Sequence, residues 1–181
     1  MSTSSDILER KLTKDFDSID FDGNGVLARD DMQRFADNVC REFNQSPDSE
    51  KCRVFQQGCM QWWDKLLNTM DKDSDHQVSR EEYIRAYRDA SEAKIMAMLD
   101  PYVDGLYTLI DDDGDDRISK SEFARLERAA GVPEAEISDV FERLDKDGSG
   151  YLSKAEFSMY IQHFYCSTDP DSPGNHLLGK P

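Results

Sequence analysis

Residues 145–156 read Asp-Lys-Asp-Gly-Ser-Gly-Tyr-Leu-Ser-Lys-Ala-Glu, with oxygen-bearing side chains at the first, third, fifth and last positions. Apolar residues recur at three- and four-residue intervals on both sides of this stretch. They are Ile137, Val140, Phe141 and Leu144 before it, and Phe157, Tyr160, Ile161 and Phe164 after it. This spacing places apolar side chains on one face of a helix. The sequence therefore predicts a helix, a polar loop and a second helix.

The same unit occurs four times along the 181 residues. The loops are residues 20–31, 71–82, 111–122 and 145–156, each between apolar-periodic segments. We expect a compact all-α fold of four helix-loop-helix units in two pairs. The expected division is residues 1–92, residues 93–166 and a tail, 167–181. Pro101 predicts a kink or a restart of the helix that enters the third loop.

The spacing of oxygen atoms in these loops is the spacing that a calcium ion needs. Calcium takes six to eight oxygen ligands, and a twelve-residue loop supplies side chains from positions 1, 3 and 5, a carbonyl from position 7 and a carboxylate from position 12. The predicted ligands are Asp20, Asp22, Asn24, Val26 and Asp31; Asp71, Asp73, Asp75, Gln77 and Glu82; Asp111, Asp113, Asp115, Arg117 and Glu122; and Asp145, Asp147, Ser149, Tyr151 and Glu156.

Three loops depart from the strongest pattern. The first ends in Asp31, which is one methylene shorter than Glu, so we expect Mg²⁺ to compete there. The third carries Asp116 at the sixth position, where Gly is usual, and we expect a small loss of affinity. The second carries His76 at that position and must hold it at positive φ, so this loop should be the weakest. We therefore expect three to four bound Ca²⁺ ions.

The eighth position of every loop is apolar: Leu27, Val78, Ile118 and Leu152. Such residues can join loop to loop in a short antiparallel bridge. We expect the first loop to pair with the second and the third with the fourth. Calcium binding within each pair should then be cooperative.

The overall composition excludes several classes of function. The net charge of −16 disfavours nucleic acid and anionic membranes as partners. We find neither a nucleophile with its base nor a glycine-rich phosphate loop, so we expect no enzymatic activity. The first ten residues lack the apolar core of a secretory signal, and we expect a cytoplasmic monomer. The four cysteines lack Cys-x-x-Cys spacing and should be reduced thiols. No protein partner can be named from the sequence.

The segments 20–27, 111–122 and 145–152 resemble the EF-hand superfamily. The chain length, the wide interval between the first two loops, Asp31 and the aromatic-rich helices are similar to the sarcoplasmic calcium-binding proteins and their bacterial calerythrin-like counterparts. The resemblance covers the chain up to about Tyr165. It implies an all-helical calcium buffer whose second site is commonly degenerate. Here the second loop departs from the family because it retains every ligand.

Two other functions stay open at this point. A calcium sensor would expose an apolar groove to a partner helix when loaded. A coelenterazine-binding photoprotein shares the four-unit layout, and this chain has the aromatic residues and histidines such a cavity uses, including His163 and Tyr165. Leu177 and Leu178 stand in an otherwise polar tail. They either fold back onto an apolar cleft or belong to a disordered segment.

Overall fold

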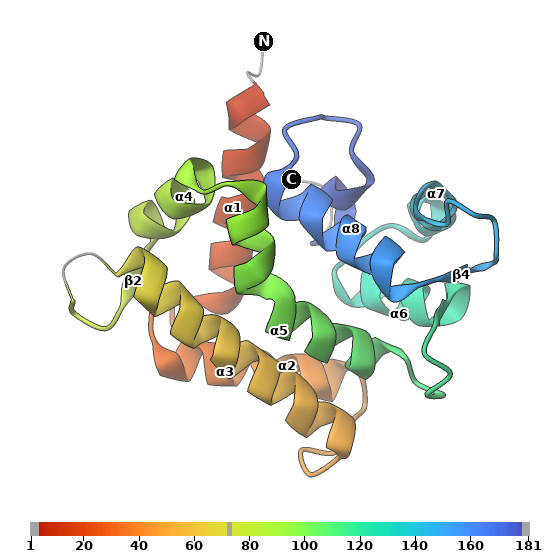
Figure 1. Cartoon of the computed structure of the whole chain (residues 1–181). Helices are drawn as coiled ribbons and strands as arrows, with labels where there is room; N and C mark the ends of the chain where they lie inside the picture. Colours follow the sequence, from red (N-terminus) through yellow and green to blue (C-terminus); the bar gives the residue numbers. More distant parts are fainter. Residues whose placement is uncertain (1–3, 72–73, 179–181) are drawn as a thin grey trace. The chain divides into compact units, whose positions relative to one another are not determined.

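The computed structural model describes residues 4–71 and 74–178, and within these ranges the fold is all-α, as predicted (Figure 1). The first four helices are α1 (Ser4–Ile19), α2 (Arg29–Glu42), α3 (Glu50–Met70) and α4 (Arg80–Asp89). The other four are α5 (Glu92–Ile110), α6 (Lys120–Ala129), α7 (Glu134–Leu144) and α8 (Lys154–Cys166). Each predicted loop lies between two of these helices.

Two-residue strands join the loops in pairs, which confirms the predicted pairing. The strands are β1 (Val26–Leu27), β2 (Val78–Ser79), β3 (Ile118–Ser119) and β4 (Tyr151–Leu152). Leu27 lies opposite Val78, and Ile118 lies opposite Leu152, both in antiparallel register. These four side chains are fully buried. The eighth position of each loop therefore serves both the bridge and the core.

The chain forms two compact units, and each contains one loop pair. One unit consists of Leu12–Leu106, and the other of Met1–Lys11 with Tyr107–Pro181. The boundaries differ from the expected division at residue 92, because the first half of α1 groups with the second loop pair and most of α5, up to Leu106, groups with the first. The assignment of residues 1–92, 93–166 and 167–181 as functional domains stays a prediction.

Helices α3 and α5 approach closely in the unit Leu12–Leu106. A Cβ on Gly58 would lie 2.2 Å from the Pro101 carbonyl oxygen, and one on Gly105 would lie 2.9 Å from the Phe55 Cα. Only glycine fits at such distances. The expectation of a restart at Pro101 is wrong: α5 runs through it, and Tyr102, the residue after it, stacks against Trp62 with ring centroids 4.7 Å apart.

A disulfide joins Cys40, near the end of α2, to Cys52, near the start of α3, so the expectation of four reduced thiols is wrong. The turn between these helices folds α3 back beside α2 and places the two Cα atoms 5.6 Å apart, within the range that a disulfide spans (Figure 1). The pairing could not be predicted from the sequence spacing of the cysteines, because two antiparallel helices, rather than a Cys-x-x-Cys turn, bring these residues together. Cys59 and Cys166 take no part in this disulfide.

The tail folds back onto its own unit as far as it is described, up to residue 178. A short 3-10 helix, η1 (Pro173–His176), packs on α8 so closely that a Cβ on Gly174 would lie 2.5 Å from the His163 Cβ. Leu177 is only 4% exposed, and Leu178 is half-buried. The buried Lys11 ammonium donates to the carbonyls of His163 and Ser167, at 3.0 and 2.8 Å. Of the two expectations for the tail, folding back is therefore correct.

Candidate metal centres

The first residue of each loop accepts hydrogen bonds that wrap the loop around its carboxylate. Asp145 accepts from the backbone N–H groups of Ser149 and Gly150, at 3.0 and 2.9 Å. Asp20 and Asp111 accept equivalent bonds, from Asn24 and Gly25 and from Gly114 and Asp116. The chain thus turns through a full circle, and the side chains at positions 3 and 5 come to the same side as position 1.

The last residue of the loop is fixed by a serine that caps the outgoing helix. Ser153 donates to Glu156 from its N–H and its hydroxyl, at 2.9 and 2.7 Å, and accepts from the Glu156 N–H. Ser79 with Glu82 and Ser119 with Glu122 repeat this arrangement. The predicted ligand set does not include these serines. The pattern Ser-x-x-Glu at a helix start would have identified the capping boxes.

These hydrogen bonds keep the last carboxylates ionised. Burial raises the pKa of Glu156, but bonds from Ser153 and from the Lys146 N–H outweigh it, and the net pKa lies below its usual value. Glu122 shows the same balance, with bonds from Ser119 and the Asp112 N–H. Both groups are therefore charged at neutral pH and suited to a hard cation.

Three loops gather carboxylate oxygens within 4.8 Å of one another. The groups are Asp20, Asp22 and Asp31; Asp111, Asp113 and Asp115; and Asp145, Asp147 and Glu156. Glu122 lies outside the second group. In the fourth loop, the Ser149 hydroxyl lies 3.0 Å from the Tyr151 carbonyl oxygen, so two further predicted ligand oxygens are adjacent. The carboxylates of each of these three groups lie close together, and their role as metal ligands stays a prediction.

Asp31 in the first loop carries a polar atom that a cation would satisfy. Asp31 is 1% exposed, and Oδ2 accepts from the Ala28 N–H at 3.0 Å, whereas among the described residues Oδ1 has no hydrogen bond of regular geometry, although the Phe21 N–H acts on this carboxyl. Burial raises the pKa of this carboxyl, and the Phe21 N–H opposes that shift only partly. A buried acceptor without a partner is costly, and a bound divalent ion removes that cost. The donor set therefore fits such an ion.

The second loop is described only in part, because Asp73 lies outside the described residues. Asp71 accepts from the N–H groups of Ser74 and His76, at 2.7 and 3.1 Å, so the turn has the same form as in the other loops. His76 has φ of +63°, as predicted, but Ser74 has the same φ where the other loops have glycine. Two strained residues rather than one support the expectation that this loop binds most weakly.

The carbonyls assigned as ligands belong to Val26, Gln77, Arg117 and Tyr151. Val26 and Tyr151 lie in β1 and β4, and Gln77 and Arg117 each precede a strand. The cation–π contact between Arg117 and Tyr151, 5.5 Å from guanidinium carbon to ring centroid, joins the seventh positions of the third and fourth loops. The full assignment of twenty ligands, Asp75 among them, stays a prediction.

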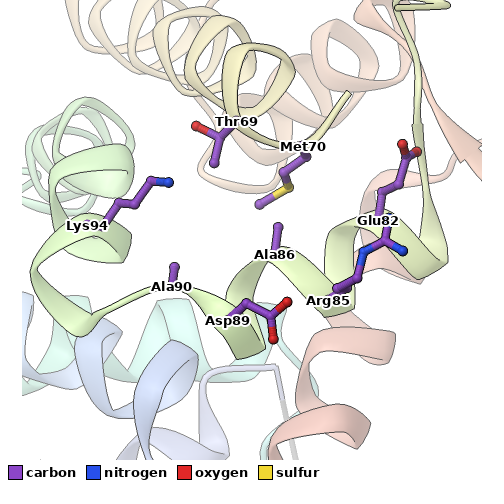
Figure 2. Close-up of a pocket in the computed structure, with 8 residues that line it drawn as sticks. All are labelled: Thr69, Met70, Glu82, Arg85, Ala86, Asp89, Ala90 and Lys94. Carbon is purple, nitrogen blue, oxygen red and sulfur yellow. The ribbon is translucent and has the colours of Figure 1, made fainter. Parts of the chain in front are cut away.

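A separate hollow lies beside the second loop, between the end of α3 and the α4–α5 junction (Figure 2). Met70, Ala86 and Ala90 supply apolar surface, and Arg85, Asp89 and Lys94 supply charges of both signs, with Glu82 and Thr69 completing the lining. Its volume of about 130 Å³ is well below the roughly 300–1,000 Å³ of small-molecule sites. This hollow is too small for an organic ligand of that class.

Comparison with known proteins agrees with this geometry. The model of an EF-hand domain pair matches residues 9–88, and that of an EF-hand domain matches residues 136–166. Calerythrin from Saccharopolyspora erythraea is 29% identical over 163 residues, covering 88% of this chain and 92% of its own. None of the described helices has the length and apolar character needed to cross a bilayer.

Solved structures share the fold over nearly the whole chain. A Streptomyces coelicolor calcium-binding protein, described in work on calcium-mediated regulation, is 27% identical with a TM-score of 0.71, over 87% of this chain and 97% of its own. The amphioxus sarcoplasmic calcium-binding protein is 20% identical with a TM-score of 0.77, over 97% and 98%. Calcium-loaded apo-aequorin from Aequorea victoria is 20% identical with a TM-score of 0.73, over 91% and 93%. The last two likenesses show the fold alone.

Proposed function

The chain belongs to the EF-hand superfamily, and from this premise we propose that it is a calcium buffer or transporter of the sarcoplasmic type. Two observations together carry the proposal: carboxylates lie close together in three loops, and few large apolar side chains of the helices and loops are exposed. In three loops, carboxylate oxygens of three residues lie within 4.8 Å of one another, which supports ion binding there. Among the described residues, the exposed large apolar side chains are only Phe21, Val54 and Tyr151. A buffer stays closed in this way when it is loaded, whereas a sensor opens.

The proposal includes the stoichiometry and the setting. We propose three to four Ca²⁺ ions, with the loop 71–82 filled last and Mg²⁺ competing at the loop 20–31. The protein acts as a cytoplasmic monomer, without catalysis and without a nucleic acid or membrane partner. The net charge of −16 and the absence of a spanning helix among the described residues support this setting.

A hydrophobic dye tests the buffer role directly. The purified protein is mixed with the dye in chelator, in Mg²⁺ and in Ca²⁺, and calorimetry on the same sample counts the bound ions. We expect Ca²⁺ to bind while dye fluorescence changes little between the Mg²⁺ and Ca²⁺ forms. A large increase specific to Ca²⁺ would contradict the buffer role, and an absence of Ca²⁺ binding would contradict the whole proposal.

A calcium sensor is the second candidate, because the description of the Streptomyces coelicolor relative concerns calcium-mediated regulation. In that case the loaded form would expose a groove for an amphipathic partner helix. The dye experiment separates the two functions.

A further inference from the structure

The third loop makes its tight turn without the glycine that such a turn usually has. Asp116 stands at the sixth position with φ of +62°, a conformation that L-residues disfavour. The first and fourth loops have Gly25 and Gly150 at this position, at φ of +86° and +83°. Something in the third loop must therefore stabilise the strained turn.

The Tyr107 hydroxyl supplies that stabilisation, because it donates to the Asp116 carbonyl at 2.9 Å. Tyr107 lies on α5, four residues before the loop begins, and is 3% exposed. Its ring packs against Phe157, with centroids 5.8 Å apart. The hydroxyl is thus held in place by packing before any ion arrives.

The Asp116 carbonyl that Tyr107 bonds belongs to the peptide unit just before the Arg117 carbonyl, a predicted metal ligand. The peptide unit between Asp116 and Arg117 has its C=O held by Tyr107 and its N–H donated to Asp115 Oδ1, at 3.0 Å. The Asp116 N–H is held by Asp111 Oδ2, at 3.1 Å. With both polar ends of this peptide fixed, the direction of the following Arg117 carbonyl is restricted as well.

The third loop alone combines these two features. The residues four places before the other loops are Phe16, Leu67 and Phe141, which have no hydroxyl. The second loop also lacks glycine at its sixth position, where His76 stands, but Leu67 cannot donate a hydrogen bond to it. The hydroxyl therefore occurs at one of the two loops that lack glycine at the sixth position.

We propose that Tyr107 is a positioning residue, whose hydroxyl holds the glycine-free turn of loop 111–122 in its ion-binding conformation. The inference rests on the proposed function, since it assigns to Tyr107 part of the calcium affinity of this loop. Tyr107 acts through the backbone of Asp116 and touches no ion itself.

The test is a double-mutant cycle on calcium affinity. Titration of the full chain with Ca²⁺ is followed by NMR, using the amides of Ile118 and Leu152 as reporters of the third and fourth loops. We expect Y107F to weaken Ca²⁺ binding at the third loop by about 3- to 10-fold, which corresponds to one net hydrogen bond. In a D116G background, where the turn is unstrained, Y107F should weaken it less than about twofold. Y102F, on the same helix, is the matched control and should leave the third loop unchanged.

Two results would overturn the inference. One is an unchanged affinity of the third loop in Y107F. The other is an equal loss in both backgrounds, because the contribution of the hydroxyl would then be independent of the strain at residue 116. Failure of the unmodified protein to bind Ca²⁺ at any loop would instead refute the proposed function, so the two failures are distinguishable.

Discussion

Glu127 is a buried acid that takes no part in the metal loops. It lies on α6, is fully buried, and accepts a hydrogen bond at 2.8 Å from the Tyr160 hydroxyl, while Oε2 has no hydrogen-bond partner among the described residues. Burial raises the pKa of this carboxyl to about 8, and the bond from Tyr160 opposes the shift only partly. The folded protein therefore keeps a proton that the unfolded chain releases at about pH 4.5.

This pKa gives a stability that depends on pH. Stabilisation from protonated Glu127 is complete below about pH 4.5 and is lost as the pH rises through about 8. We expect the free energy of unfolding to fall by roughly 1–3 kcal/mol between pH 6 and pH 9 through this group. E127Q should remove that part of the slope, as measured by urea unfolding at saturating Ca²⁺. Equal slopes in both proteins would contradict the assignment.

We propose that Asp31 sets the choice between Ca²⁺ and Mg²⁺ in the first loop. Replacing it by the longer glutamate lets the carboxylate close on the ion with both oxygens, which favours the larger Ca²⁺ over Mg²⁺. We expect D31E to raise Ca²⁺ affinity at one site by roughly three- to tenfold and to reduce Mg²⁺ competition, measured by calorimetry with and without Mg²⁺. The neighbouring D30E, at an exposed residue that is not a predicted ligand, is the control and should change neither quantity.

Residue-level reasoning predicted the carboxylates but not their supports. The acids at loop positions 1, 3, 5 and 12 are fixed by spacing alone, because a twelve-residue loop has few ways to surround an ion. Tyr107 escaped detection because its role depends on which atom of the loop faces the last turn of α5. The positive φ of Ser74 was not predicted, because it follows from the geometry that all four loops share rather than from the residue type.

At the scale of elements, the Cys40–Cys52 disulfide joins the end of α2 to the start of α3. Because α2 leaves the first loop and α3 enters the second, the bond ties together one helix from each unit of the first pair. It closes a loop of about 13 residues, for which chain-entropy estimates give a stabilisation of about 3 kcal/mol. In a reducing cytoplasm the pair would exist as thiols for much of the time.

A thiol count and an unfolding curve together test this bond. We expect two reactive thiols in the denatured, oxidised protein, from Cys59 and Cys166, and four after reduction. Reduction should lower the free energy of unfolding by up to about 3 kcal/mol. The C40S/C52S variant should match the reduced protein and be insensitive to reductant. Four thiols in protein purified without reductant would show that the bond does not form.

The helices and their loop-to-loop bridges could be predicted from apolar periodicity, since each bridge residue had to be buried. The path of α5 could not. Pro101 predicted a kink or a restart, but α5 continues through it, and the close contacts of Gly58 with Pro101 and of Gly105 with Phe55 pack α3 against this helix. Tertiary packing of this kind overrides local preference and is not visible in a local pattern.

At the scale of the whole molecule, folding and calcium binding should be coupled. Many carboxylates converge in a chain of net charge −16, and without a cation they repel one another. Ligands that bind only the folded state stabilise it by mass action. We expect chelation to lower the melting temperature by more than about 10 °C, measured by calorimetry. Restoring Ca²⁺ should reverse the change, whereas KCl at equal ionic strength should not, and a melting temperature indifferent to chelator would contradict the coupling.

Both tryptophans, Trp62 and Trp63, lie on α3, the helix that enters loop 71–82, and both are buried in the unit Leu12–Leu106. Intrinsic indole emission is therefore a label-free optical signal from one loop pair only, with Tyr102 a close neighbour of Trp62 at 4.7 Å. A stopped-flow trace excited at the indole band would show when that pair fills. Comparison with total ion uptake would then give the order in which the two halves load.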